Sequence, residues 1–159
     1  MTIPNLADLV QAHHLDIAHE WIEAVRHDPR IHSDDGMSDS GLRDHVPFMI
    51  EEICNLLRTQ QTPQAANTRE GRVHVYTRYR LGYRPRDLVC EISLLRMILL
   101  DHLEQGMLSA QTGGLKTYVE ATRIINRYID EELRYAISVY TEAETQSQLP
   151  DGTEQGAAT

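Results

Sequence analysis

The sequence predicts an all-α fold with about five main helices, of which the last is long. Apolar residues recur at three- and four-residue steps along most of the chain, which is the spacing of the buried face of a helix. No segment shows the alternation of apolar and polar residues that a half-buried strand requires. The last apolar stripe continues for about 30 residues, which is roughly 45 Å at 1.5 Å per residue and exceeds the width of a small domain.

Length, composition and charge limit the classes of protein to which the chain can belong. Its 159 residues and 18.2 kDa amount to one domain, and 41% apolar with 25% charged residues is typical of a folded globular protein. A formal net charge of -9 opposes binding to nucleic acid or anionic lipid, because those partners select clustered Lys and Arg. We therefore expect a globular domain with neither kind of partner.

Cysteine usage and the N-terminal residues indicate a cytoplasmic protein. Cys54 and Cys90 are the only thiols, and both lie among aliphatic residues rather than in a redox or zinc-binding spacing. The N-terminal residues lack the basic stretch and apolar run of a signal peptide. The most apolar segment, residues 88–103, contains charged side chains and is too short for a membrane span. We expect neither export nor membrane insertion.

The first two predicted helices occupy the N-terminal third of the chain. The first begins at Asn5, which is placed to cap it, and ends at Asp28, which precedes a proline. The second begins at Ser38 or Ser40. Pro47 lies inside this second segment, where it either kinks the helix or marks the start of its regular part, because proline lacks the amide donor.

The third and fourth predicted helices follow a polar linker. The third extends from about Thr68 to Leu81 and stops at Gly82, the residue best able to adopt the left-handed conformation that ends a helix. Pro85 fits the first position of the fourth helix, which we expect to end before Gly106. This fourth helix is apolar nearly all round, so we expect it to be central and covered on several sides.

The last predicted helix begins near Gly114 and continues to about Thr145. We expect its distal end to leave the core, because the helix is longer than the domain is wide. Residues 146–159 have the composition of a flexible tail or linker, which leaves residues 1–145 as the folded domain.

Apolar residues in the distal half of this helix predict a second role for it. They are placed to form a homodimer interface in a helical bundle or short coiled coil, or alternatively to cover the first helix of the same chain. The residues concerned are Ile129, Leu133, Ile137 and Tyr140.

Two adjacent segments carry a pattern that resembles a known family. Residues 74–83 form a His-x-x-x-Arg helix ending in glycine and an aromatic residue, and residues 88–96 contain Leu-Val-x-Glu-x-x-Leu-Leu-Arg. In order, spacing and position before one long terminal helix, they resemble the N-terminal domain of RsbR/RsbRD-type stressosome regulators and of some bacterial sensor histidine kinases. The resemblance covers roughly residues 5–145, although the first two helices match only in length and apolar pattern.

The resemblance implies a globin-like helical bundle without haem that acts as a bacterial signal-input domain. It implies a cytoplasmic homodimer without catalysis of its own, which relays a conformational change through its last helix to an output module. Related non-haem globin sensors can hold a fatty acid in an apolar tunnel, which makes a lipid-like or other apolar ligand a hypothesis here. No output domain is recognisable after the long helix, so we expect either a fragment of a larger sensor or a free-standing regulator.

Ionisable residues inside the third and fourth predicted helices indicate a buried polar network. His74 and Arg78 are four residues apart and therefore neighbours on one helix face. Glu91 and Arg96 are five apart, which turns them about 140 degrees from each other on a helix. Because an unpaired buried charge is costly, we infer that Glu91 meets His74 or Arg78 across the two helices. The network either fixes helix register alone, or lines a ligand pocket or senses pH through His74.

Other chemistry has weaker support in the sequence. A metal site is not expected at the N-terminal cluster of His13, His14, Asp16 and His19, because no two histidines are four residues apart. Kinship to globins makes haem an alternative cofactor, with His74 or His102 as the internal ligand. His19 followed by Glu20 is superficially similar to a phospho-accepting box, but the rest of that motif and any nucleotide-binding loop are missing. We expect no catalytic residue.

Overall fold

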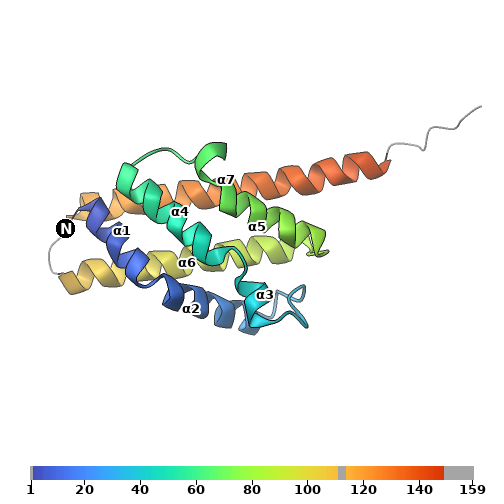
Figure 1. Cartoon of the computed structure of the whole chain (residues 1–159), viewed down its shortest axis with the longest axis horizontal. Helices are drawn as coiled ribbons and strands as arrows, with labels where there is room; N and C mark the ends of the chain where they lie inside the picture. The colour runs from blue at the N-terminus through green and yellow to red at the C-terminus, as the bar shows by residue number, and fades with distance from the viewer. Residues whose placement is uncertain (1, 111–113, 149–159) are drawn as a thin grey trace, which may run out of the picture.

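Helices make up the structure, a computed structural model that describes residues 2–110 and 114–148 (Figure 1). In those residues there are seven α-helices, one short 3-10 helix and no strand. The all-α prediction with a long C-terminal helix is confirmed. Seven helices replace the predicted five because each of the first two predicted helices is split in two.

The first predicted helix is divided at His13 into α1 (Ile3–Ala12) and α2 (His14–His27). The His14 ring contributes to the break, because its Nδ1 lies 2.8 Å from the carbonyl oxygen of Gln11, an acceptor that an uninterrupted helix would use. The expectation that a single helix continues to Asp28 is therefore wrong.

The cap of α1 also differs from the prediction. Thr2 is the N-cap and Asn5 occupies the third helical position. From there the Asn5 side-chain oxygen accepts a hydrogen bond from the Thr2 backbone amide at 2.9 Å, so Asn5 takes part in a reciprocal capping box. Asn5 therefore stabilises the start of the helix from inside it.

The second predicted helix is divided into α3 (Asp39–Arg43) and α4 (Val46–Thr59). Ser38 caps α3, so of the two predicted starting residues, Ser38 and Ser40, the first is correct. Asp44 has a positive φ of 37° and turns the chain between the two helices. Pro47 lies in the first turn of α4, where its missing amide has no helical partner to lose, so it marks the start of the regular helix.

The predicted end of the third helix is correct. A 3-10 helix, η1 (Ala65–Asn67), precedes α5 (Arg69–Arg80), and Gly82 follows with a φ of 80°, in the left-handed region. The fourth helix, α6 (Pro85–Ala110), begins at the predicted proline.

The predicted end of α6 before Gly106 is wrong, because the helix continues through this glycine. A Cβ at Gly106 would lie 2.7 Å from Cδ2 of Leu9 on α1. Gly106 therefore allows α1 to approach α6 closely instead of ending the helix. The opposite side of α6 is partly open, since Met97 is 60% exposed, so α6 is central without being covered all round.

The last helix, α7 (Leu115–Gln148), packs on α6, α5, α4 and α1, and its contact with α5 extends to Tyr140. Figure 1 shows its C-terminal part continuing past the ends of the other helices, as expected from its length. Of the predicted tail, residues 146–148 belong to α7, and residues 149–159 lie outside the described residues.

Asp87, in the first turn of α6, holds the loop between α2 and α3. Its Oδ2 accepts hydrogen bonds from the His32 amide at 3.1 Å, the Ser33 amide at 3.0 Å and the Ser33 hydroxyl at 2.6 Å. Burial alone would raise the pKa of Asp87, but these donors and Arg84 outweigh it and lower the pKa from 3.8 to about 2.

Asp87→Asn should lower the free energy of unfolding by about 2 kcal/mol near neutral pH. A carboxylate with a lowered folded pKa stabilises the fold above its unfolded pKa of 3.8, and that contribution is lost as the pH falls towards about 2. Urea denaturation of the wild type and the variant near neutral pH and near pH 3 measures both effects. Equal stabilities near neutral pH would show that this carboxylate does not hold the loop.

Candidate functional site

A buried ion pair connects α5 and α6. Arg78 Nε donates to Glu91 Oε2 at 3.1 Å, and both side chains are 0% exposed. His74 Nε2 lies 3.6 Å from the same oxygen, slightly beyond hydrogen-bond length. The structure thus places three of the four predicted network residues together, across the two helices where the sequence places them.

The Arg78 guanidinium also holds α3 in place. Its second terminal nitrogen donates to the carbonyl of Leu42 at 2.6 Å, and the guanidinium carbon lies 5.1 Å from the ring centroid of Tyr83. From α2, the Trp21 indole donates to the backbone carbonyl of Glu91 at 2.9 Å. The buried charge pair therefore connects α3, α5 and α6, and the backbone of Glu91 adds a contact to α2.

The charge states in this network follow from its burial. Burial lowers the pKa of His74, so the imidazole is neutral near neutral pH. Burial alone would raise the pKa of Glu91, but His74 and Arg78 outweigh it and leave the pKa below its ordinary value. The pair is thus Glu91 carboxylate and Arg78 guanidinium, with no net charge. This arrangement supports a role in fixing helix register over pH sensing through His74.

Arg96 lies apart from this network. Its guanidinium is 3.7 Å from Asp130 Oδ1 on α7, and its side chain is 29% exposed. The offset of five residues from Glu91 turns Arg96 towards α7 instead of α5. Arg96 therefore connects α6 to α7 and takes no part in the buried ion pair.

The four residues predicted at a dimer interface have different environments. Ile129 is fully buried in its own chain, so the expectation that it faces a second copy is wrong: the neighbouring helices already cover it. Leu133 packs partly on the same core. The Tyr140 hydroxyl donates to the backbone carbonyl of Tyr83 at 2.6 Å. Only Ile137, at 64% exposure, is free to contact another molecule.

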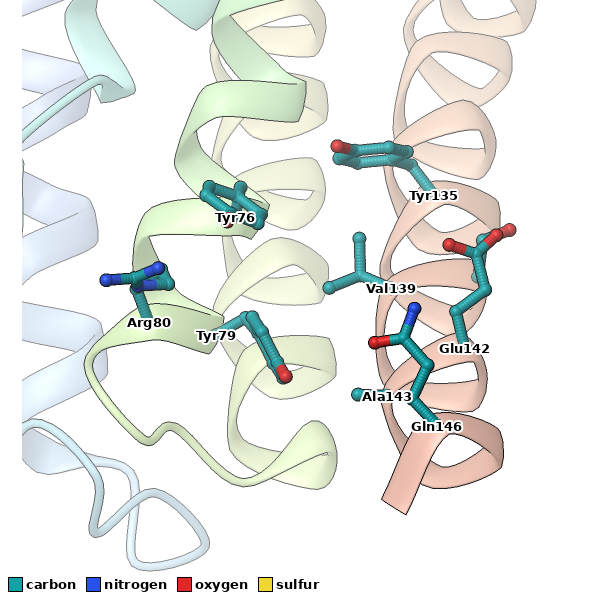
Figure 2. A pocket seen from close by; sticks show the side chains of 9 residues that line it. Tyr76, Tyr79, Arg80, Tyr135, Val139, Glu142, Ala143 and Gln146 are labelled. Carbon is teal, nitrogen blue, oxygen red and sulfur yellow. The ribbon is translucent and has the colours of Figure 1, made fainter. Parts of the chain in front are cut away.

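A groove of about 630 Å³ opens between α5 and the distal part of α7. Figure 2 shows Tyr76, Tyr79 and Arg80 on α5, with Tyr135 and Val139 opposite on α7. Tyrosine rings thus face it from both helices, with polar side chains of α7 near its distal end. A second hollow of about 410 Å³ shares two of these tyrosines. Sequence analysis did not identify this groove, because its two walls are about sixty residues apart in the chain.

Comparison with known families establishes what kind of chain this is. The family model described as "RsbT co-antagonist protein rsbRD N-terminal domain" matches residues 15–154, nearly the whole chain. The chain belongs to this family. The resemblance seen in the sequence is therefore confirmed, and the RsbRD N-terminal domain is a stressosome-type regulatory domain. No curated protein and no solved structure matches the chain.

Sequence analysis of this RsbRD N-terminal domain did not identify the buried acid Glu132. Glu132 on α7 is 0% exposed, and neither of its carboxylate oxygens has a hydrogen-bond partner among the described residues. Its position carries a signal, because it lies three residues after Ile129 and four before Ala136, both buried on the same helix face. A charged side chain favours a solvent-exposed position, so the sequence alone does not show that Glu132 is buried. The packing of the neighbouring helices decides it.

Gly71→Ala tests how closely this RsbRD N-terminal domain packs around Glu132. A Cβ at Gly71 would overlap the Glu132 carboxyl group, so we expect a loss of about 1 to 3 kcal/mol of unfolding free energy. Glu132→Ala removes the obstruction, and in that background the alanine should be tolerated, because it favours the helix by up to about 1 kcal/mol over glycine. Thermal unfolding measures both. A Gly71→Ala protein as stable as the wild type would contradict this packing.

Two of the histidines considered for metal or haem lie beside acidic side chains. His13 lies 3.4 Å from Asp16, and His102 lies 3.1 Å from Glu20. Over residues 2–110 and 114–148 of this RsbRD N-terminal domain, no three His, Cys, Asp or Glu side chains form a group that could hold a metal ion. In the same residues, no helix has the length and apolar character needed to cross a bilayer.

Proposed function

We propose that this RsbRD N-terminal domain is a non-catalytic bacterial signal-input domain that forms a homodimer and relays a conformational change through α7 to an output module. Family membership supports the regulatory role. The observation that carries the rest is Ile137 in the distal half of α7, which is 64% exposed although Tyr140, three residues later, still packs on α5. An exposed apolar residue on a long helix is suited to pairing with the same helix of a second copy.

Contacts along α7 support its role as the relay. Asp130 reaches α6 through Arg96, the Tyr128 hydroxyl donates to Glu52 on α4 at 2.7 Å, and Tyr135 stacks under an α5 arginine. Further along, the rings of Tyr140 and Tyr79 on α5 meet edge to face at 5.2 Å. A change in the packing of α4, α5 or α6 therefore alters the contacts that position α7, which is the structural basis of a two-state relay.

The groove between α5 and α7 is the place that we propose for a small ligand, with the apolar part of the ligand directed to the adjoining hollow beside Val73, Tyr76 and Tyr135. Its volume of about 630 Å³ is in the usual range for small-molecule sites. Its tyrosines offer flat apolar faces with hydroxyls at their edges, and it is lined from both helices (Figure 2). A ligand seated there would contact α5 and α7 together and would favour one arrangement of the two helices.

Native mass spectrometry of the purified chain tests this proposal. The expected spectrum is dominated by a species with twice the mass of one 18.2 kDa chain. A retained apolar ligand would add its own mass, and one ligand per chain would support the groove as a binding site. A spectrum containing only single chains at high protein concentration would contradict the dimer, and a haem mass would contradict a haem-free sensor.

A further inference from the structure

A second buried polar cluster lies where α4, α5 and α7 meet. Glu132 of α7 is pressed against the backbone of α5 at Gly71, where a Cβ would overlap its carboxyl group. The side chain is 0% exposed, and neither of its oxygens accepts or donates a hydrogen bond among the described residues. A carboxylate held in this way carries the full cost of leaving water, without a partner to offset it.

A neighbouring acid on α4 occupies the donors that Glu132 would need. Glu52 accepts hydrogen bonds from the Glu70 amide at 2.8 Å, the Gly71 amide at 3.4 Å and the Tyr128 hydroxyl at 2.7 Å. The first-turn amides of α5, which favour negative charge, are thus bound to Glu52. Glu132 is left facing a second acidic side chain across the same turn of α5.

The charges around Glu132 favour its neutral form. Burial is the largest cause that raises its pKa, to about 8, and Glu52 on α4 and Glu131 on α7 add to the shift. Arg72 on α5 opposes it, but the Arg72 guanidinium lies over the ring of Tyr135, 4.7 Å from its centroid. Three further charged groups on the surrounding helices are paired elsewhere: Glu70 with His45, Arg96 with Asp130, and Asp8 with Arg58.

We propose that Glu132 is a proton-operated latch: α7 packs closely against α4 and α5 while Glu132 is protonated and moves away from them when it ionises. Ionisation places a charge in a dry site beside Glu52, and the two carboxylates repel each other. The charge reaches water only if α7 shifts away from Gly71. The latch is a property of a single chain, and only its consequence for an output module rests on the proposed function.

The place of Glu132 on α7 connects the latch to the distal segment. It lies two residues after Asp130, which pairs with Arg96 on α6, and three before Tyr135, which lines the groove towards α5. A displacement of α7 at Glu132 therefore changes the width of the groove and the direction of the projecting end. A ligand in the groove and a proton on Glu132 each act on the position of α7. Binding at one site therefore changes the affinity of the other.

Thermal unfolding across pH tests whether Glu132 titrates as the latch requires. The midpoint of the wild type should fall as the pH rises from about 5 to about 8, and Glu132→Gln should remove most of this fall. Near pH 8 we expect Glu132→Gln to unfold about 5 to 10 °C above the wild type. Glu144→Gln, the same substitution at an exposed position of α7, should follow the wild type. Equal pH dependence in Glu132→Gln and the wild type would overturn the latch.

Hydrogen exchange of the full chain, corrected for the intrinsic effect of pH, tests whether α7 moves. Peptides covering the middle of α7 and the first turn of α5 should exchange faster near pH 9 than near pH 6 in the wild type, and equally in Glu132→Gln. Exchange that is independent of pH in the wild type would overturn the latch. Light scattering on the same samples separates the two proposals, because a dimer with no pH response contradicts the latch alone, and a pH-responsive monomer contradicts the dimer alone.

Discussion

Arg78→Met should lower the free energy of unfolding by about 3 to 5 kcal/mol, the largest loss expected from a single change in this chain. The substitution leaves the Glu91 carboxylate buried without its counter-charge, since both side chains are 0% exposed and 3.1 Å apart. It also removes the donor to the carbonyl of Leu42, which positions α3. Urea denaturation followed by the fluorescence of Trp21, the only tryptophan, reports on this site because its indole binds Glu91.

Two further variants separate the charge effect from a general loss of packing. Adding Glu91→Gln to Arg78→Met removes the unpaired charge and should recover a large part of the lost stability. Arg80→Met, the same substitution at an exposed position two residues later on α5, should change stability by less than about 0.5 kcal/mol. A loss of only about 1 kcal/mol for Arg78→Met would contradict a dry, tightly coupled ion pair.

Glu132→Gln should have the opposite sign and raise the free energy of unfolding by about 3 kcal/mol near neutral pH. The pKa of Glu132 is raised from 4.5 to about 8 in the folded chain, first by burial and then by Glu52. A raised acid pKa gives stability that is complete below 4.5 and is lost as the pH rises through the folded value of about 8. The neutral amide does not undergo this loss.

The pH window makes the result specific to ionisation. Wild type and Glu132→Gln should converge near pH 4.5 and separate progressively up to about pH 8, as measured by urea denaturation at several pH values. Glu144→Gln supplies the matched control on the same helix. A Glu132→Gln protein less stable than the wild type near pH 8 would contradict this prediction. It would show that the ionised carboxylate makes stabilising interactions in the fold that the amide cannot make.

Much of the fold is predictable from local signals in the sequence. Pro85 and Gly82 mark the boundary between α5 and α6 because each residue has a backbone preference that needs no tertiary contact. Gly106 suggests a helix end that does not occur, because its role depends on a tertiary contact. It makes room for Leu9, which lies on a helix nearly a hundred residues earlier in the chain. The break at His13 depends on a ring contact to Gln11, which helix periodicity does not reveal.

In the candidate site, too, some contacts are predictable from local sequence signals and others depend on tertiary packing. Helix spacing and the cost of burying charge lead from sequence to the contact between Arg78 and Glu91, because Glu91 interrupts a largely apolar helix and Arg78 lies on the preceding one. They do not lead to Arg96, whose partner Asp130 lies on another helix with no sequence signal of its own. Ile129 and Ile137 belong to one apolar stripe, and only the arrangement of the neighbouring helices shows that the first is covered and the second exposed.

Sedimentation velocity of Ile137→Asp beside Leu115→Asp tests most directly the central claim that the distal half of α7, around Ile137, is the surface through which this domain contacts another copy. Both residues are exposed apolar side chains on α7: Ile137, in the distal half, is 64% exposed, and Leu115, at the start of the helix, is 78% exposed. The account predicts that Ile137→Asp sediments as a single chain at a concentration where the wild type and Leu115→Asp remain dimers. A dimer unaffected by Ile137→Asp, or equally weakened by both substitutions, would contradict it.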